Sequence, residues 1–297
     1  MTPPATLPVA LVQIACSANR EDNWRKLGTR IEQAAADGAR LVVLQELHNS
    51  LYFCQTEDPA NFDLAESIPG PSTEFFGNLA RTHGVVIVAS LFERRAPGLY
   101  HNTAVVLDAD GRVAGRYRKM HIPDDPGYYE KFYFTPGDLG FEPVETRVGA
   151  LGVMVCWDQW YPEAARLMAL AGADLLIYPT AIGWHPADDA AEKQRQYDAW
   201  TLIQQSHAVA NGLPVLVANR TGFEATPGPS GDGIEFWGGS FICGQQGEIL
   251  ARAGHAQDCV LRCDIDRARG EQVRRMWPYL RDRRIDAYQD LVLRFRK

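Results

Sequence analysis

Two stretches of the chain share one pattern, and this repeat constrains the fold more than any other feature. Residues 38–46 read GARLVVLQE and residues 172–180 read GADLLIYPT, so each runs from Gly-Ala into an apolar strand. Each stretch follows a strand and a helix-period segment, which is the order of a β-α-β unit. Because successive residues of both strands are apolar, we expect both faces of each strand to be buried. Two such halves predict an α/β protein with two sheets packed together and helices outside, a four-layer α-β-β-α sandwich.

The same alternation of apolar runs and helix-period stretches continues along the chain. Helices are expected at 23–36, from Ser72 or Thr73 to Thr82, from Pro162, and near 190–211. Strands are expected at 9–15, 41–45, 85–91, 151–156, 175–178 and 214–219. Glycine-containing turns predict two hairpins, 104–107 with 112–119 and 239–243 with 248–253. The hairpins add antiparallel strands, so both sheets are expected to be mixed.

Composition and charge exclude several classes of protein. No linker divides the 297 residues, so we expect a single domain over 1–297. Thirty basic against 37 acidic residues give a formal charge of −7, which disfavours nucleic acid and anionic membranes as partners. The N-terminal apolar run is too short and interrupted for a signal peptide or membrane span. Six cysteines without metal-ligand spacing predict free thiols, no metal site and a cytoplasmic location.

Reactive side chains follow three of the predicted strands. The chain has no phosphate-binding glycine loop, no H-E-x-x-H and no G-x-S-x-G, so nucleotide, zinc-protease and serine-hydrolase chemistry lack their motifs. Glu46, Lys119 and Cys156 each end a strand. A thiol there, beside a helix N-terminus, is a candidate nucleophile because the positive helix end favours the thiolate. Taken singly, Cys156 fits a packing cysteine equally well, and Glu46 and Lys119 fit ordinary exposed charges better than a catalytic site.

The segments that carry these residues match a known family. LQE at 44–46, YRKMHIP at 117–123 and VCWDQWYPE at 155–163 resemble the nitrilase-like carbon–nitrogen hydrolases. The three motifs occur in the family's order, and the resemblance covers about residues 8–285. It implies the α-β-β-α fold already expected from the repeat. It also implies a catalytic Glu–Lys–Cys triad that uses no metal ion or cofactor.

The resemblance assigns a role to each residue of the triad. It makes Cys156 the nucleophile, Glu46 the general base, and Lys119 the stabiliser of the oxyanion together with the backbone N–H of Trp157. A second glutamate, which in this family helps to position the substrate and the base, fits Glu130. The alternative for this residue is a loop carboxylate paired with the neighbouring lysine.

His121 is the rival general base, in a Cys–His mechanism. It lies two residues after Lys119. The resemblance assigns the general base to Glu46 instead, which disfavours His121 in that role. His185 and His207 have no clustering partners and are expected to be structural.

A narrower resemblance concerns the substrate. Segments 51–55, 121–134, 156–161 and 178–183 are similar to the branch of the family that hydrolyses N-carbamoylputrescine to putrescine, carbon dioxide and ammonia. Such a substrate has a flat ureido head, a four-carbon stem and an ammonium, so aromatic residues and an acid are expected around it. The expected substrate-binding residues are Tyr52, Trp157, Trp160, Trp184 and Asp125, with Asp188 or Asp189 as alternative partners of the ammonium.

Three further expectations remain open on the sequence alone. An arginine-lined site would instead favour carbamoyl amino acids such as 3-ureidopropionate. A catalytically silent scaffold is the alternative outside the enzymes, although the intact triad argues against it. The segment RDRRIDAY at 281–288 resembles the family's C-terminal tail, so residues 270–297 are expected to make contacts in a homo-oligomer built from dimers.

Overall fold

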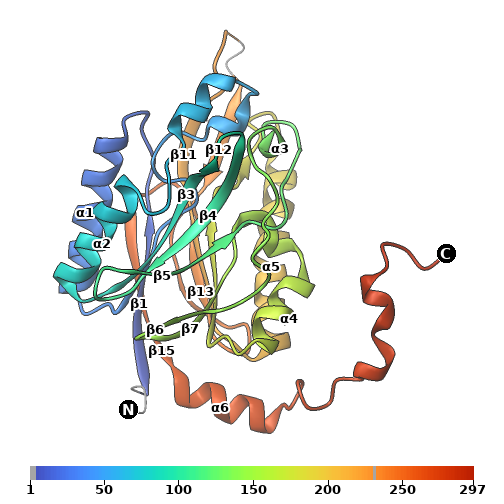
Figure 1. Ribbon diagram of the computed structural model, residues 1–297. Coiled ribbons are helices and arrows are strands. Elements are labelled where there is room, and N and C mark those ends of the chain that lie inside the picture. Colours follow the sequence, from blue (N-terminus) through green and yellow to red (C-terminus); the bar gives the residue numbers. More distant parts are fainter. Residues whose placement is uncertain (1–4, 230–231) are drawn as a thin grey trace.

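The computed structural model describes residues 5–229 and 232–297, which form four layers (Figure 1). Within these residues two six-stranded sheets lie face to face, in the orders β15-β1-β2-β3-β4-β5 and β14-β13-β10-β8-β7-β6. Two helices cover the outer face of each sheet, so the predicted α-β-β-α sandwich is confirmed. These helices are α1 (Arg20–Ala36) and α2 (Pro71–His83) on the first sheet, and α4 (Pro162–Leu170) and α5 (Ala190–Asn211) on the second.

Both sheets are mixed, as expected from the hairpins. The first contains β1 (Thr6–Gln13), β2 (Leu41–Val43), β3 (Val86–Ala96), β4 (Leu99–Leu107), β5 (Val113–Arg118) and β15 (Cys259–Asp266). The second contains β6 (Val144–Thr146), β7 (Gly149–Val153), β8 (Leu175–Thr180), β10 (Val215–Asn219), β13 (Phe241–Cys243) and β14 (Ile249–Arg252). The parallel strands are β1, β2 and β3 in one sheet and β7, β8 and β10 in the other.

Strand β1 shows why the central strands are apolar on successive residues. Val9 and Leu11 belong to the core between the two sheets, whereas Ala10 and Val12 pack with Leu27 in the core beneath α1 and α2. Side chains alternate between the faces of a strand, and here both faces are covered. The apolar runs therefore report a strand that is buried on both sides.

The two repeated stretches occupy equivalent places in the two sheets. Gly38 and Gly172 have φ of 93° and 98°, a left-handed conformation that favours glycine where a helix gives way to the next strand. The strands that follow are β2 and β8. The stretches then meet end to end, because the backbone N–H of Glu46 donates to the carbonyl of Thr180 at 3.3 Å. The carboxyl ends of parallel strands from both sheets converge there, which is where ligands bind in open α/β sheets.

Several predicted boundaries were wrong. Strand β2 ends at Val43 rather than at residue 45, and β7 ends at Val153 rather than at Cys156. Helix α2 follows Gly70 and begins at Pro71, so neither Ser72 nor Thr73 precedes it. The hydroxyl of Thr73 instead accepts from the N–H of Gly70 at 2.8 Å, from within the first turn.

A third sheet near the site was not predicted. It contains β9 (Gly183–Trp184), β11 (Thr221–Ala225) and β12 (Gly233–Trp237), in the order β11-β12-β9. A short helix, α3 (Glu130–Tyr133), also lies beside the site.

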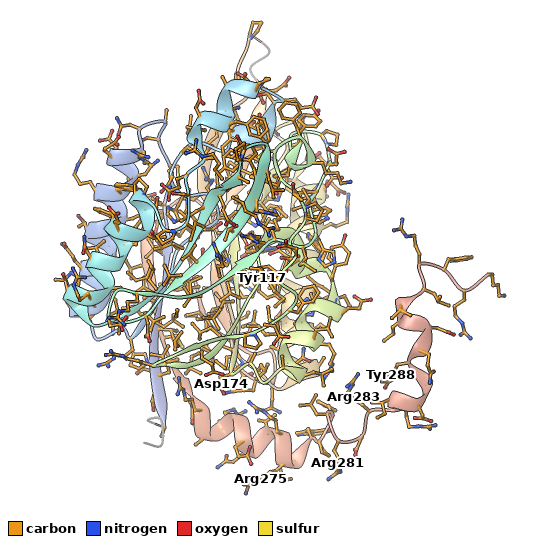
Figure 2. All side chains as sticks on the ribbon, viewed as in Figure 1. Tyr117, Asp174, Arg275, Arg281, Arg283 and Tyr288 are labelled. Carbon is orange, nitrogen blue, oxygen red and sulfur yellow. The ribbon has the colours of Figure 1, made fainter. Side chains whose placement is uncertain are left out.

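The C-terminal segment leaves the layers. Helix α6 (Arg267–Met276) runs along one end of the sandwich, and the chain beyond it, which includes Arg283 and Tyr288, stands away from the layers (Figure 2). No helix in the described ranges is long and apolar enough to cross a membrane.

Candidate active site

Glu46, Lys119 and Cys156 follow β2, β5 and β7, and the fold brings these three strand ends together. The Lys119 ammonium donates to Glu46 Oε1 at 2.8 Å and to Glu130 Oε2 at 2.7 Å. The side chains of the lysine and both carboxylates are fully shielded from solvent. Buried charges of this kind are stable only when they are paired and hydrogen-bonded, and here one cation bridges two anions.

The two oxygens of Glu46 differ in their surroundings. Oε1 accepts from Lys119 and also from the side-chain amide of Asn102 at 2.7 Å. Oε2 is buried and has no hydrogen-bond partner among the described residues. One oxygen is therefore held in place while the other remains available to accept a proton. The sequence did not predict Asn102, which lies on β4 and contacts the site because β4 pairs with β5.

Glu130 belongs to this cluster and is not a loop carboxylate paired with Lys131. It is the first residue of α3, and its Oε1 accepts from the hydroxyl of Tyr52 at 2.7 Å. Burial raises the pKa of Glu130 to about 7, although the charge of Lys119 acts in the opposite direction. The predicted residue Tyr52 therefore contacts the second glutamate and does not line the cavity directly.

Burial also governs the other two titratable groups. Burial alone would lower the pKa of Lys119, but the charges of Glu130 and Glu46 outweigh it and raise that pKa well above its ordinary value. Burial and the charge of Glu46 raise the pKa of the Cys156 thiol well above its ordinary value, although Lys119 lowers it. This shift opposes the thiolate that a helix N-terminus favours, so removal of the thiol proton calls for a nearby base.

The turn that carries Cys156 is held by a buried carboxylate. Cys156 has a φ of 43° and opens a 3₁₀ turn, Cys156–Trp160. Asp158 Oδ2 accepts from the backbone N–H of Val155 and from the Tyr117 hydroxyl, both at 3.0 Å. Its Oδ1 accepts from the backbone N–H of His121 at 3.0 Å. Asp158 thus joins the turn of Cys156 to the segment on either side of Lys119.

The position of His121 disfavours it as the rival base. Its Nδ1 lies 2.7 Å from Asp158 Oδ1, and its ring stacks on Tyr161 with 3.7 Å between ring centres. His121 is also not among the residues that line the cavity described next. The imidazole is therefore engaged on the side of Asp158 rather than beside the sulfur.

A cavity of about 530 Å³ opens onto Cys156 and Glu130. Its apolar wall includes two of the predicted aromatic residues, Trp157 and Trp160. Trp184, also predicted, is not part of the wall, because its ring packs on Trp237 at 5.5 Å and its indole N–H donates to the Lys193 carbonyl. The wall contains further aromatic and apolar residues, namely Tyr128, Ile182 and Trp237.

Carboxylates also line the cavity. The predicted residues Asp125 and Asp188 line it, whereas Asp189 instead caps α5 by accepting from the N–H of Glu192 at 2.8 Å. Glu192 and Arg195 also line the cavity. Neither residue was predicted from the sequence, although both lie in the first turns of the helix expected near 190–211.

An α-β-β-α sandwich with a buried thiol, carboxylate and ammonium at the junction of its sheets defines the class of carbon–nitrogen hydrolases. The chain belongs to this family, because residues 8–275 match the carbon-nitrogen hydrolase family model. The resemblance found in the sequence motifs is thereby confirmed.

The curated relatives that match nearly the whole chain include an N-carbamoylputrescine amidase and a citrullinase. The N-carbamoylputrescine amidase of Solanum lycopersicum is 43% identical over 286 residues, which cover 96% of this chain and 94% of that protein. The citrullinase of Francisella tularensis is 41% identical over 292 residues, covering 98% and 100%. Among solved structures, the carbon-nitrogen hydrolase from Helicobacter pylori G27 has a TM-score of 0.95 and 54% identity, covering 98% of this chain and 100% of that one.

Proposed function

We propose that this protein hydrolyses N-carbamoylputrescine to putrescine, carbon dioxide and ammonia through a covalent intermediate on Cys156. The observation that carries the proposal is the Lys119 ammonium bonded to Glu46 and Glu130 beside a buried thiol in an aromatic cavity. In this proposal Cys156 is the nucleophile, Glu46 is the general base and Lys119 stabilises the oxyanion. Glu130 positions Lys119 and Tyr52.

In the first half of the reaction, one proton moves from the thiol to the departing nitrogen, and a carbon–sulfur bond replaces a carbon–nitrogen bond. Burial raises the pKa of the Cys156 thiol, and in this proposal Glu46 takes the thiol proton as the sulfur attacks the ureido carbon. The carbonyl oxygen becomes negative beside Lys119 and the backbone N–H of Trp157, which stabilise it. Glu46 then returns the proton to the departing nitrogen, and the carbon–nitrogen bond breaks to leave a carbonyl–sulfur bond.

Water completes the reaction. Glu46 removes a proton from a water molecule while the oxygen of that water bonds to the carbonyl carbon. Glu46 then passes the proton to the sulfur as the carbon–sulfur bond breaks. Loss of ammonia in the first half leaves a carbamic acid in the second. This acid decomposes to carbon dioxide and the free amine. The balance of atoms needs one water and no oxidant, reductant or further reactant.

The charge of the cavity supports a cationic substrate. Among the described residues, four carboxylates line the cavity, those of Asp125, Glu130, Asp188 and Glu192, against the one guanidinium of Arg195. That guanidinium is already compensated, because its Nε donates to Glu192 Oε2 at 2.9 Å. The aromatic wall fits the four-carbon stem, and the proposal assigns the ammonium to Asp188 with Asp125 nearby.

Two related substrates differ at the amine end. Citrulline carries the same ureido group with an α-amino acid in place of the ammonium, and the similarity to the Francisella tularensis citrullinase makes it the second candidate. The carboxylate of 3-ureidopropionate would need an arginine that is not already paired. Arg195 is the cavity's arginine, and its bond to Glu192 disfavours that substrate.

Comparing the three ureido substrates tests the proposal. We expect kcat/KM for N-carbamoylputrescine to exceed that for citrulline and 3-ureidopropionate, with putrescine and ammonia released in equal amounts. A Cys156→Ala variant should release no ammonia, and a substrate-dependent mass adduct should form on the native thiol. Preference for citrulline or 3-ureidopropionate would overturn the substrate. Unchanged ammonia release by the Cys156→Ala variant would overturn the mechanism and leave the scaffold alternative.

The setting of the reaction is also part of the proposal. We place it in the cytoplasm, because all six cysteines, each within the described ranges, are free thiols. We further propose one domain over 1–297 whose tail, residues 270–297, contacts a second copy of the chain in a homo-oligomer built from dimers. Its support is the exposed apolar side chains of the tail, among them Val292 at 90% and Phe295 at 78% exposure.

A further inference from the structure

The loop that follows β2 carries two side chains of the site. Glu46 begins this loop and bonds Lys119, while Tyr52 ends it and bonds Glu130. Residues 46–52 form turns rather than a strand or helix, so no sheet ladder fixes their backbone. Leu47 has a φ of 47°, a left-handed conformation that is costly for a residue with a branched side chain. Something outside the loop must hold it in this shape.

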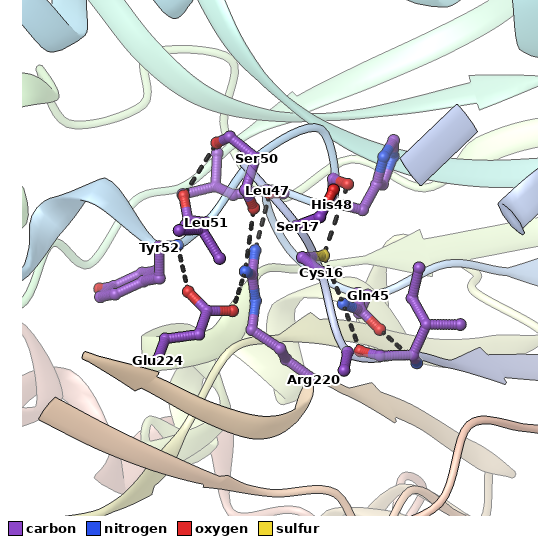
Figure 3. A network of polar contacts seen from close by, with 12 residues as sticks. Cys16, Ser17, Gln45, Leu47, His48, Ser50, Leu51, Tyr52, Arg220 and Glu224 are labelled. Carbon is purple, nitrogen blue, oxygen red and sulfur yellow. Dashed lines mark hydrogen bonds and ion pairs between the residues drawn. The ribbon is translucent and has the colours of Figure 1, made fainter. Parts of the chain in front are cut away.

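Several groups outside the loop bond it, and Arg220, directly after β10, bonds more than one of its carbonyls (Figure 3). Its guanidinium is fully buried, with Nη1 donating to the Ser50 carbonyl at 3.0 Å. Nη2 donates to the carbonyls of Leu47 at 2.7 Å and Glu46 at 3.2 Å. A planar fork of donors matches several carbonyls at once, which an ammonium on a flexible stem does not.

Glu224 of β11 completes the arrangement. Its Oε1 accepts from Arg220 Nη1 at 2.6 Å, and its Oε2 accepts from the backbone N–H of Tyr52 at 2.6 Å. Burial disfavours the charge of Arg220, but the neighbouring negative groups, Glu224 among them, keep the pKa of the guanidinium above its ordinary value. The ion pair therefore contacts both ends of the loop (Figure 3). Arg220 bonds the Leu47 carbonyl near its start, and Glu224 bonds the backbone N–H of Tyr52 at its end.

We propose that Arg220 and Glu224 are positioning residues that hold the side chain of Glu46 in place and, through Tyr52, that of Glu130. The proposal rests on the assignment of Glu46 as the general base. Neither Arg220 nor Glu224 lines the cavity, so they act through the loop and not on the substrate. A buried ion pair is weak support for stability by itself, whereas a loop whose backbone groups have no ladder needs charged partners to fix one conformation.

The chain offers a matched ion pair for comparison. Arg118 and Glu93 form an equally buried Arg–Glu pair, with Arg118 Nη2 donating to Glu93 Oε1 at 2.8 Å. Glu93 accepts from Arg118, Arg116 and Thr103, none of which belongs to the loop 46–52. A substitution of Glu93 therefore removes a buried ion pair but leaves the contacts of the loop 46–52 unchanged.

The test compares Arg220→Lys and Glu224→Gln with Glu93→Gln. We expect the two loop variants to lower kcat about 10- to 100-fold, as sub-ångström misplacement of a catalytic group does, while KM changes less than about twofold since the cavity wall is intact. The Glu93→Gln variant should lose stability to urea but keep its kcat. If Arg220→Lys does not fold, Glu224→Gln and the more conservative Glu224→Asp, which should recover part of the kcat, carry the comparison.

A second readout separates positioning from folding and from substrate choice. The rate at which iodoacetamide alkylates Cys156, followed from pH 6 to 10, reports how Glu46 and the thiol interact and needs no substrate. We expect Arg220→Lys and Glu224→Gln to shift this profile in the same direction as Glu46→Gln, by a smaller amount, and Glu93→Gln to leave it unshifted. Loop variants with wild-type kcat and profile would overturn the positioning role. A wild-type profile in Glu46→Gln would overturn the general base instead.

Discussion

Lys119 is the residue on which the buried charges of the site depend. Its ammonium bonds two carboxylates that are both shielded from water. The Lys119→Met variant leaves those carboxylates buried and unpaired, so each is expected to hold a proton more tightly. We expect the free energy of unfolding at pH 8 to fall by about 3–5 kcal/mol and turnover to fall at least about 100-fold.

Urea unfolding and ammonia release measure the two effects. Lys131→Met is the matched control, because Lys131 is exposed and lies next to Glu130 in sequence. It should change neither stability nor rate. An equal loss in both variants would contradict the role of the Lys119 charge.

Glu130 is expected to control the acid side of the pH profile. Burial raises its pKa from 4.5 to about 7, so the folded protein binds this proton more tightly than the unfolded chain. Its contribution to stability is therefore fully present below pH 4.5 and is lost as the pH rises to about 7. Activity should change in the opposite direction, because Tyr52 and Lys119 both donate to the ionised carboxylate.

The measurement is kcat/KM against pH for the wild type and Glu130→Gln. We expect the wild-type activity to rise through pH 7 and the variant to lack this ionisation, with activity lowered about 10-fold or more. If kcat/KM of the Glu130→Gln variant still rises near pH 7 as in the wild type, the ionisation belongs to another group.

At the scale of the elements, sequence patterns located helices and strands well but not their functional ends. The helix expected near 190–211 is observed as Ala190–Asn211, because its length and its terminal glycine are local signals. Strands β2 and β7 end early, since the chain must turn to deliver Glu46 and Cys156. Leu47 and Cys156 are the non-glycine residues with positive φ in the described ranges. A run of apolar residues indicates that a strand is buried, but it does not indicate where the backbone makes such a turn.

The parts of the site that the sequence missed depend on contacts between distant segments. Motif resemblance placed Glu46, Lys119, Cys156 and Glu130 in one site, and the structure brings them together. Nothing near Asn102 in sequence indicates that its amide reaches Glu46, because that contact arises from the pairing of β4 with β5. The third sheet was missed for a similar reason, since β12 pairs with β9 about 50 residues earlier in the chain.

Asp158 provides a test of how one element positions another. It bonds the turn of Cys156 to the segment around Lys119, and Asp158→Asn leaves it fewer acceptor positions for the same donors. We expect kcat to fall about 10-fold or more with little change in KM, and the free energy of unfolding to fall by about 1–3 kcal/mol. Steady-state kinetics and urea unfolding measure both.

The control for this prediction is Asp174→Asn. Asp174 (Figure 2) accepts through its Oδ2 from the N–H of Ala150 at 3.0 Å, near the start of β7. Cys156 follows the other end of that strand. We expect its kcat to equal that of the wild type. Equal kinetic losses in both variants would show that any weakened strand end slows the reaction.

At the scale of the whole molecule, the tail is expected to control assembly. The family match ends at residue 275, and the residues beyond it expose apolar side chains, including Met276 and Ile285. We expect a chain ending at Met276 to form particles with fewer copies of the chain than the full-length protein forms, measured by light scattering after size-exclusion chromatography. The substitutions Val292→Asp and Phe295→Asp should act in the same direction. The same number of copies per particle in all these proteins would refute the role of the tail.

The hydrogen bond between Glu46 and Thr180 has a consequence for the life of the chain before it is complete. Glu46, Lys119 and Glu130 are synthesised before Cys156, and the base reaches the sulfur only when the second sheet docks on the first. Until then the nascent polypeptide carries an ordinary, unassisted thiol. The complete cluster is therefore a product of the packing of the two sheets, and a chain in which only the first sheet has formed lacks the thiol side of the site.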